Sequence, residues 1–287
     1  MTKPFYLTEE IVSLFIESAL AEDIGEGDHS SLGAVPKELI SKAKLVIKAD
    51  GVIAGLDLAE KIFKKFDNTL SVSFSKKDGD IIKSGEIGFV VEGSARSILT
   101  TERFVLNCMQ RMSGIATYTH QLCSLIKDLP TQIMDTRKTT PNFRICEKWA
   151  VSIGGGQNHR YALYDMVMLK DNHIDMAGGI RNAIINTQAY LQSKNKKLKI
   201  EVETRSIEEV SEVLRVGGID AIMLDNMSLA EMKKAVTLIN GKYKTEASGG
   251  ITEKTIRDVA LCGVDFISVG ALTHSVKSLD LSLKVFK

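Results

Sequence analysis

Four short apolar runs in the second half of the chain end at polar or glycine residues that recur at an almost constant interval. The run ends are Glu203, Asp225, Ser248 and Gly270, which are 22, 23 and 22 residues apart. This interval fits one strand followed by one helix, and strands that alternate with helices are typical of a parallel sheet. The pattern predicts an α/β barrel-like fold, in which the carboxyl ends of the strands bring the residues that follow them to one edge.

Two earlier apolar runs extend this series. The six predicted strands are 132–134, 166–169, 199–202, 221–224, 244–247 and 266–269. We assign them to an α/β barrel domain over residues 115–274, whose active-site mouth is formed by the loops after the strands.

The first third of the chain has a different pattern. Residues 8–22 have apolar residues at helical spacing with Thr8 as a candidate N-cap, and strand-like runs follow at 43–49, 70–74 and 87–91. A long helix is predicted from about Ala95 to Ile126, interrupted at Ser113 and Gly114. These elements predict an N-terminal α+β domain over residues 1–114, joined by residues 275–287.

Composition excludes several classes of protein. The chain has 37 Lys and Arg against 36 Asp and Glu, so its net charge is +1 and no nucleic-acid partner is expected. No run approaches the roughly 18 apolar residues of a membrane-spanning helix, and Glu9 and Glu10 argue against a signal peptide. The four cysteines form no CxxC pair, which fits free thiols in a reducing compartment. We expect a cytoplasmic globular protein with no membrane partner.

Cationic side chains gather at the predicted strand ends and in the loops near them. They are Arg137, Lys138, Arg144, His159, Arg160, Lys170 and His173. A cleft lined with one sign of charge concentrates small anions, and arginine forks suit carboxylates and phosphates. The alternative is a solvated charged face, which fits poorly because several of these cations follow strand ends. The sequence therefore predicts a basic pocket for a small anion.

Two acids, Glu203 and Asp225, follow neighbouring predicted strands in the same region. Carboxylates there suit sugar hydroxyls or Mg²⁺, which prefers oxygen ligands. The alternative for both acids is a structural salt bridge to Lys170 or Arg137.

Ser248, Gly249 and Gly250 precede a helix that we predict from about Thr252. Backbone N–H groups at a helix N-terminus can hold a phosphate, and late loops are the usual phosphate site of such barrels. Taken alone, these three residues are as consistent with an ordinary turn.

Lys170 leaves a second chemistry open. A desolvated lysine at a strand end can form a Schiff base with a carbonyl substrate, as in barrel aldolases. Borohydride would trap such an intermediate on the enzyme.

Four motifs closely resemble the quinolinate phosphoribosyltransferases (carboxylating), also called nicotinate-nucleotide pyrophosphorylases. They are Asp135–Pro141, Gly154–Arg160, Leu163–Met166 and Lys170–Ile174. Weaker matches extend the resemblance from about residue 22 to 281. One small departure lies at 28–31, where the family more often has threonines, and it affects only the N-terminal domain.

The resemblance implies a reaction and a fold. Members of this family join quinolinate to 5-phosphoribosyl-1-pyrophosphate, with Mg²⁺, and release pyrophosphate and CO₂ to give nicotinate mononucleotide for NAD biosynthesis. Their fold is an α/β sandwich-like N-terminal domain followed by an incomplete α/β barrel. They form homodimers with shared active sites, and some assemble into hexamers.

The resemblance also assigns roles to residues. Arg137, His159, Arg160 and Lys170 hold the quinolinate carboxylates, and Arg103 of the partner subunit completes this pocket. Lys138 and Lys170 face the phosphoribosyl donor, with Glu203 and Asp225 at the ribose hydroxyls and Mg²⁺. Ser248, Gly249, Gly250, Gly270 and His274 lie at the 5-phosphate or its neighbouring loops, and Thr136 is a further substrate-binding residue.

A paralogue associated with molybdate transport is a further alternative of a different class. Such relatives lose the Lys-Asp-Asn-His motif and the Asn before His-Arg. This chain keeps Lys170–His173 and Asn158, which disfavours that alternative.

Overall fold

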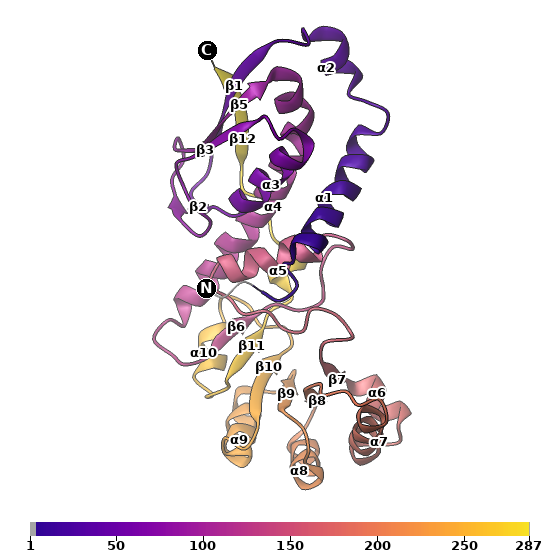
Figure 1. Cartoon of the computed structure of the whole chain (residues 1–287). Coiled ribbons are helices and arrows are strands. Elements are labelled where there is room, and N and C mark those ends of the chain that lie inside the picture. The colour runs from indigo at the N-terminus through magenta and orange to yellow at the C-terminus, as the bar shows by residue number, and fades with distance from the viewer. Residues whose placement is uncertain (1–3, 287) are drawn as a thin grey trace. The chain divides into compact units, whose positions relative to one another are not determined.

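The computed structural model describes residues 4–286, which fold into a mixed α/β protein (Figure 1). The chain divides into two compact units. The first unit contains the residues up to His120, Lys138–Gly155 and the residues from Ala271 on, and the second contains Gln121–Arg137 and Gly156–Gly270. None of the helices within 4–286 has the length and apolar character needed to cross a bilayer.

The first unit is built on an antiparallel four-stranded sheet in the order β12-β1-β5-β3. These strands are β1 (Ile40–Ile47), β3 (Ser71–Phe74), β5 (Ile87–Ser94) and β12 (Leu281–Phe286). Ala43, Leu45 and Ile47 alternate along β1 and are fully buried, as expected of a sheet with one core face. Phe89 of β5 packs edge-on against Phe63 of α3 (Leu56–Phe66) with ring centroids 5.8 Å apart, so α3 contributes to this core.

The predicted first helix and the three predicted strands are all present in this unit. Helix α1 (Glu9–Ile24) begins as predicted, because Oγ1 of Thr8 accepts a 3.2 Å hydrogen bond from the backbone N–H of Ile11. The three strands predicted at 43–49, 70–74 and 87–91 correspond to β1, β3 and β5. The remaining elements of the unit are α2 (His29–Ala34), β2 (Gly51–Val52), β4 (Ile81–Ile82), α5 (Arg144–Ile153) and α11 (Ala271–His274).

The predicted interruption at Ser113 and Gly114 is wrong, because α4 (Ala95–Leu125) is continuous there. Ser113 uses its hydroxyl to accept a 2.9 Å hydrogen bond from the backbone N–H of Ala54. A Cβ at Gly114 would lie 2.2 Å from the carbonyl oxygen of Lys277. The glycine therefore permits close packing of the 277–278 backbone on the helix, and does not break it.

Helix α5 groups with the first unit, which differs from the predicted barrel boundaries of 115–274. Its fully buried Glu147 accepts a 2.9 Å hydrogen bond from Nη2 of Arg111 on α4. Arg111 also donates to the carbonyl of Val276 at 2.7 Å. Removing either partner would leave a charge buried and unpaired, so this ion pair holds α5 and the 271–276 loop to α4.

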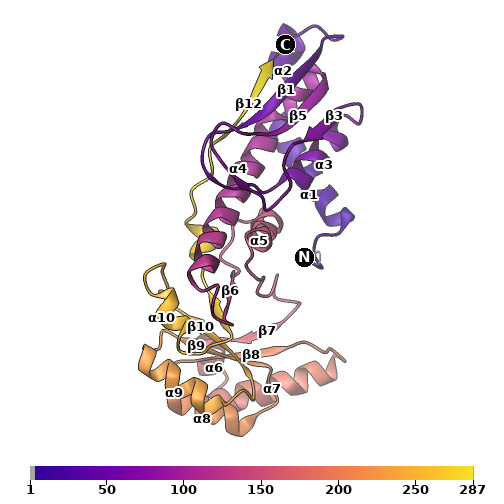
Figure 2. The same cartoon turned by 90° about the vertical axis from the view of Figure 1, so that its left-hand side faces the viewer.

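The second unit is a parallel six-stranded sheet in the order β6-β11-β10-β9-β8-β7. Its strands are β6 (Gln132–Met134), β7 (Val167–Leu169), β8 (Ile200–Thr204), β9 (Ala221–Asp225), β10 (Lys244–Ser248) and β11 (Phe266–Ser268). All six predicted strands are confirmed. Helices α6 (Asp171–Met176), α7 (Ile180–Ser193), α8 (Ile207–Val216) and α9 (Leu229–Ile239) lie along one side of this sheet (Figure 2), and α10 (Ile256–Ala260) follows β10.

Alternate residues of each strand point to opposite faces of the sheet, and the two faces differ in chemistry. The apolar set is fully buried and includes Val202, Ile222, Leu224, Ala247 and Ile267. These side chains form the core with the covering helices. The residues between them face the other way, and on β8, β9 and β10 most of them are polar.

Candidate functional site

Strand register places the polar side chains of neighbouring strands in rows on one face. Glu203 of β8 and Glu246 of β10 both pair with Met223 of β9, so all three lie at the same level. Strand alternation then assigns one set of side chains to this face, which we call the polar face. It consists of Lys170, Glu201, Glu203, Asp225, Glu246 and Ser248.

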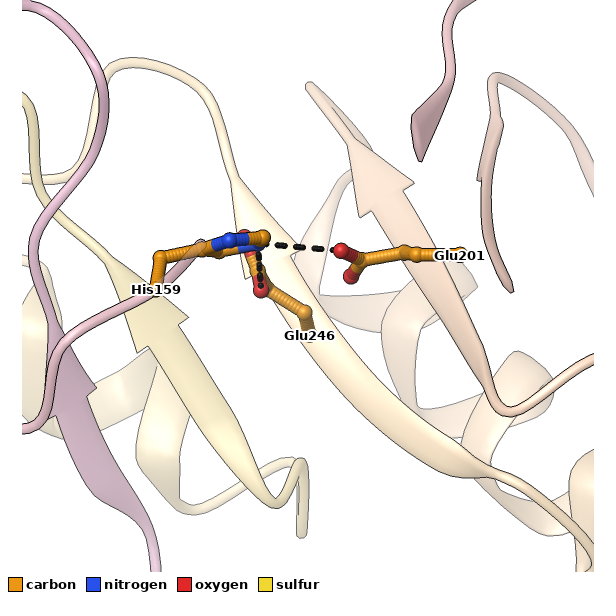
Figure 3. Close-up of side chains that lie close together, drawn as sticks. All are labelled: His159, Glu201 and Glu246. Atoms are coloured by element: carbon orange, nitrogen blue, oxygen red, sulfur yellow. Dashed lines mark ion pairs between the residues drawn. The ribbon is translucent and has the colours of Figure 1, made fainter. Parts of the chain in front are cut away.

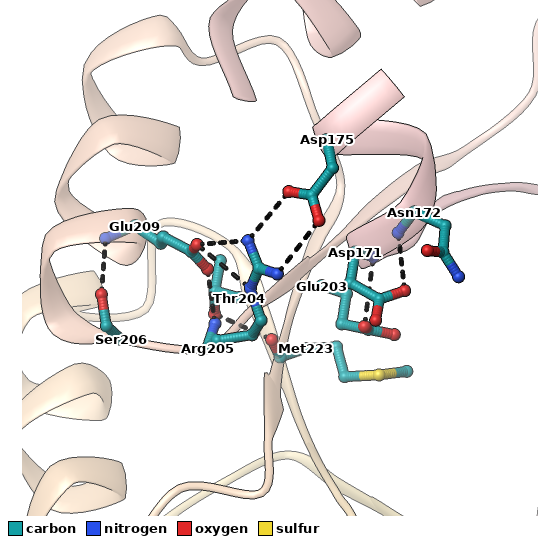
Figure 4. A network of polar contacts seen from close by, with 9 residues as sticks. All are labelled: Asp171, Asn172, Asp175, Glu203, Thr204, Arg205, Ser206, Glu209 and Met223. Atoms are coloured by element: carbon teal, nitrogen blue, oxygen red, sulfur yellow. Dashed lines mark hydrogen bonds and ion pairs between the residues drawn. The ribbon is translucent and has the colours of Figure 1, made fainter. Parts of the chain in front are cut away.

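Glu203 lies at the carboxyl end of β8, where Oε1 accepts a 3.2 Å hydrogen bond from the backbone N–H of Asp171 (Figure 4). Its side chain is buried, and this burial raises its pKa. The negative charge of Asp225 adds to the increase, whereas the Asp171 N–H and Lys170 oppose it. Two carboxylates that repel each other at adjoining strand ends favour a cation or a positively charged transition state between them.

Lys170 is the N-cap of α6, and its side chain is exposed. Its backbone N–H donates a 3.0 Å hydrogen bond to Nδ1 of His173. The structure therefore gives His173 a capping role, whereas the sequence placed it among the pocket cations. The Lys170 amine is left at the edge of the polar face.

Arg160 lies beside a second guanidinium. Burial lowers the pKa of Arg160, and the positive charge of Arg137 lowers it further, while Asp165 and Glu201 act in the opposite direction. Nη1 of Arg160 donates to the carbonyl of Met166 at 3.2 Å, which orients the fork. Two half-buried guanidinium groups that repel each other are suited to a bound anion.

The imidazole of His159 is turned toward two buried carboxylates (Figure 3). Nε2 lies 2.9 Å from Oε2 of Glu201 and 3.1 Å from Oε2 of Glu246, and Nδ1 accepts a 2.6 Å hydrogen bond from the backbone N–H of Arg160. Burial disfavours the charged ring, but the two carboxylates outweigh this effect and raise the pKa of His159 to about 10. Burial, together with the charge of Glu246, raises the pKa of Glu201 to about 7.

The segment before Arg160 is attached to the edge of the sheet. Gln157 forms a parallel bridge with Met134 of β6, and its N–H donates to the carbonyl of Ile133 at 2.8 Å. The fully buried carboxylate of Asp135 accepts hydrogen bonds from the backbone N–H of His159 at 2.9 Å and from Nδ2 of Asn158 at 2.6 Å. These contacts place the Gln-Asn-His-Arg motif beside β6. The motif is too short to have a strand-like pattern, so the sequence does not predict this placement.

Ser248, Gly249 and Gly250 form a tight turn after β10. The carbonyl of Ser248 accepts a 2.9 Å hydrogen bond from the N–H of Asn226. Gly249 has φ +98°, and a Cβ there would lie 2.9 Å from the backbone nitrogen of Asn226, so only glycine fits.

The predicted helix start near Thr252 is wrong, because α10 begins at Ile256 and has five residues. Its start is delayed by a turn in which the N–H groups of Thr255 and Ile256 donate to the carbonyl of Thr252. The phosphate prediction therefore depends on the N–H groups of the 248–250 turn and not on a helix N-terminus.

The structure brings most of the predicted site residues into the second unit and leaves others in the first. Thr136 and Gly270 follow β6 and β11 in the second unit and are half-buried. Arg103 is exposed on α4 in the first unit.

Lys138 and His274 also belong to the first unit, where both are exposed. The carbonyl of Lys138 accepts a 2.7 Å hydrogen bond from Oγ1 of Thr273, which links the segment after Arg137 to α11. Nδ1 of His274 lies 2.6 Å from Oγ of Ser275.

Sequence reasoning missed Glu201, Glu246 and Asp135. Glu201 and Glu246 each precede a predicted site residue by two positions, Glu203 and Ser248 respectively. In a strand this spacing places two side chains on the same face. The alternation of side chains along each strand could therefore have identified Glu201 and Glu246. A single acidic residue within a strand, however, forms no recognisable motif.

Two family models match the chain. The quinolinate phosphoribosyl transferase N-terminal domain matches residues 28–113, and the C-terminal domain of the same family matches residues 115–284. A chloroplastic nicotinate-nucleotide pyrophosphorylase [carboxylating] from Arabidopsis thaliana is 47% identical over 285 residues, which is 94% of this chain and 81% of that protein.

Bacterial relatives are similar in sequence and in structure. A probable nicotinate-nucleotide pyrophosphorylase [carboxylating] from Bacillus subtilis is 42% identical over 264 residues, covering 92% of this chain and 90% of that one. The solved structure of the nicotinate-nucleotide pyrophosphorylase from Francisella tularensis superposes with a TM-score of 0.89 at 36% identity, and covers 100% of both chains.

Proposed function

Because this chain belongs to the quinolinate phosphoribosyltransferase family, we propose that it transfers phosphoribosyl from 5-phosphoribosyl-1-pyrophosphate to quinolinate with decarboxylation. The products are nicotinate mononucleotide, pyrophosphate and CO₂, as required for NAD biosynthesis. The observation that carries the proposal is the pairing of the Arg137 and Arg160 guanidiniums in the same unit as the Glu203 and Asp225 carboxylates.

Quinolinate is a dianion near neutral pH, and we assign its carboxylates to the basic side chains of the second unit. Arg137 and Arg160 repel each other in the absence of an anion, so a bound carboxylate relieves this repulsion. Lys170 contributes an exposed ammonium directly after β7, and Nδ1 of His159 holds the backbone N–H of Arg160.

Positive charge develops at the anomeric carbon of the donor as the bond to pyrophosphate breaks. We assign Glu203 and Asp225 to the electrostatic stabilisation of this charge and to the ribose hydroxyls. The Asp171 N–H holds Glu203 in place, so little reorganisation is needed when the charge appears. The resemblance assigns Lys138 and Lys170 to the donor, with Lys138 offsetting negative charge on the departing oxygen.

The reaction proceeds in two chemical steps. The anomeric C–O bond breaks with its electron pair on pyrophosphate, and the quinolinate ring nitrogen donates its lone pair to form the new N–C bond. The bond between ring carbon 2 and its carboxylate then breaks. CO₂ leaves, and the electron pair remains on carbon 2, beside the cationic nitrogen that stabilises it, until a proton is taken up.

The acid pair also fits Mg²⁺. Repulsion by Asp225 helps to raise the pKa of Glu203, and the positive charge of Lys170 offsets this increase only in part. Glu203 and Asp225 would hold the ion, which would supply charge neutralisation beside the donor pyrophosphate.

The resemblance further supports a homodimer, and the composition supports a cytosolic location. We propose that Arg103 of one protomer completes the quinolinate pocket of its partner, and that some assemblies of this family type extend to hexamers. The phosphate of the donor is assigned to Thr136, Gly270, His274 and the 248–250 turn. A reducing compartment fits the four cysteines, which are all free thiols in the structure.

A single assay tests the proposed reaction. Quinolinate, donor and Mg²⁺ are supplied together, and nicotinate mononucleotide and CO₂ are measured in parallel. Equal amounts of both products are expected. Covalent trapping of substrate by borohydride in place of this reaction would support a Schiff-base aldolase that uses Lys170, and contradict the proposal.

A further inference from the structure

At the polar face lies a buried cluster of three ionisable side chains. The resemblance implies that one of them, His159, holds a quinolinate carboxylate, but both of its ring nitrogens are engaged within the protein. Glu201, Glu246 and His159 are 1%, 1% and 8% exposed. They come from β8, from β10 and from the segment beside β6, so the sheet itself brings them together (Figure 3).

The contacts of the ring nitrogens assign different roles to them. Nδ1 of His159 accepts the N–H of Arg160, so this nitrogen must be unprotonated. Nε2 is then the protonated nitrogen, and it lies between Oε2 of Glu201 and Oε2 of Glu246, at 2.9 and 3.1 Å. The two carboxylates lie on either side of the N–H, and neither has the alignment of a full hydrogen bond. Both attract the same proton, and together they select one tautomer and one orientation of the ring.

We propose that Glu201 and Glu246 are positioning residues that act on the dicarboxylate site through His159. They fix the imidazole from below, and its Nδ1 fixes the backbone N–H of Arg160, whose guanidinium binds a substrate carboxylate. Asp135 holds the same segment from the other side by accepting the N–H of His159. This inference rests on the proposed function, because it takes Arg160 as a ligand of the substrate.

The cluster keeps a proton rather than a metal ion. Among the described residues it offers three donor atoms within 4.8 Å of one another, but a metal-bound histidine almost always donates the N–H of its other ring nitrogen, and Nδ1 of His159 accepts. Because the three groups are in contact, the protons belong to the cluster as a whole. The raised pKa values of His159 and Glu201 therefore describe the retention of a proton by the cluster, and not a doubly protonated ring. Nδ1 accepts the Arg160 N–H, so a proton bound in addition to Nε2–H lies on the carboxylates.

The kinetic test uses Glu201→Gln, Glu246→Gln and Glu246→Leu, with Glu209→Gln as the matched control. Glu209 is a glutamate of α8 in the same unit, and its carboxylate pairs with the exposed Arg205 (Figure 4). We expect Glu246→Leu to raise the KM for quinolinate about tenfold or more, because a displaced Arg160 would lose a charge-assisted hydrogen bond to the substrate carboxylate, with the donor KM changed less than twofold. Glu246→Gln keeps an acceptor oxygen and should restore part of the loss.

A merely structural role predicts a different result. It would lower the melting temperature of these variants, or change both KM values together, and either outcome without a selective rise for quinolinate would overturn the proposal. If the Leu variant does not fold, the two Gln variants decide the same question.

A second measurement uses the wild-type enzyme without substrate, and so does not depend on the proposed reaction. Nitrogen-15 NMR of labelled histidine side chains, assigned with His159→Gln, should show Nε2 protonated and Nδ1 unprotonated for His159. A proton on Nδ1 would overturn the inference while leaving the proposed function intact.

Elemental analysis of protein purified without added metal adds one outcome. The cluster would be a metal site if the protein contained a stoichiometric transition metal and if a chelator removed both this metal and the original His159 nitrogen signals. That result would also overturn the proposal. If the wild type makes no nicotinate mononucleotide, the proposed function fails, and the NMR result still decides the state of the cluster.

Discussion

The backbone N–H of Asp171 donates a 3.2 Å hydrogen bond to Oε1 of Glu203, which joins the first turn of α6 to the end of β8. Oε1 of this carboxylate is therefore held by the backbone, and Oε2 does not take part in this hydrogen bond. The arrangement holds a negative charge in a buried position at the edge of the polar face.

Replacing Glu203 by Gln keeps this shape but removes the charge. We expect kcat to fall by roughly 10²–10³, the order of effect seen when one electrostatic stabiliser is lost, with the quinolinate affinity little changed. Burial raises the pKa of Glu203, so the wild-type kcat should also fall as the pH is lowered through a value above 4.5. Steady-state kinetics across pH test both points, with Asp175→Asn as a surface control, and a normal kcat would remove Glu203 from the mechanism.

Arg160→Ala should weaken quinolinate binding far more than donor binding. The substrate carboxylate loses a two-pronged partner in a half-buried site, at a cost of about 2–4 kcal/mol. Arg205→Ala is the matched control, because that arginine pairs with Asp175 and Glu209 on the surface of the same unit. Calorimetry measures both ligands, and an equal loss for the two would mean that Arg160 only supports the fold.

Gly249 and Gly250 provide a paired test of the turn after β10. Both have positive φ, so alanine at either position carries about 1–2 kcal/mol of left-handed strain. Only at Gly249 would the new Cβ also collide with Asn226, at 2.9 Å from its backbone nitrogen. Gly249→Ala should therefore destabilise the protein more in urea unfolding, and raise the KM for the donor more, than Gly250→Ala. Equal effects would contradict a turn shaped by this close approach.

The cluster around His159 should make the free energy of unfolding decrease as the pH rises above neutral. Its groups have pKa values raised to about 7 for Glu201 and about 10 for His159, above the ordinary values of 4.5 and 6.5. Between pH 7 and 10 the folded cluster therefore binds about one proton more than the unfolded chain, and stability falls as pH rises.

The expected slope is about 1.4 kcal/mol of unfolding free energy per pH unit for one proton. Denaturant titrations of the wild type and of the Glu201→Gln, Glu246→Gln double variant measure it, and the slope should be smaller in the double variant. Parallel slopes would show that the cluster does not retain a proton.

Mixed dimers test whether Arg103 acts on the partner subunit. Arg103→Ala and Lys170→Ala should each be inactive alone. In a mixed dimer one site carries both lesions and the other carries neither. After joint unfolding and refolding at equal amounts, activity should return to roughly a quarter of the wild type, because half of the dimers have one good site of two. Verified heterodimers that stay inactive would show that Arg103 acts within its own chain.

The parallel sheet could be predicted because its signal is local and repeated. Each strand of the second unit is a short apolar run before a polar end, and the interval between ends such as Glu203 and Asp225 identifies the βα repeat. Helix α3 and strand β12 were not predicted, although Leu281 and Leu283 alternate as in a strand. Their place depends on partners distant in sequence, which no local pattern specifies.

The site was predictable where a residue follows a strand, and not where its role depends on a contact. Arg137 and Arg160 were identified as anion ligands from charge and position, and the structure places them near each other. The orientation of His159 toward Glu201 and Glu246 depends on how the 156–160 segment lies along β6. The bridge of Gln157 to Met134 and the hydrogen bonds to Asp135 decide this, and they leave no periodic trace in the sequence.

The pairing of β1 with β12 determines when the antiparallel sheet can be completed during translation. Ile47 pairs with Leu281, so the first strand of this sheet waits for a partner that is translated roughly 230 residues later. At about 5–20 residues per second, that delay is on the order of 10–50 s. During this time the edge of β1 that β12 later covers is open to other strands. The ribosome therefore finishes the parallel sheet before the antiparallel one, and the part of the protein that is made first is completed last.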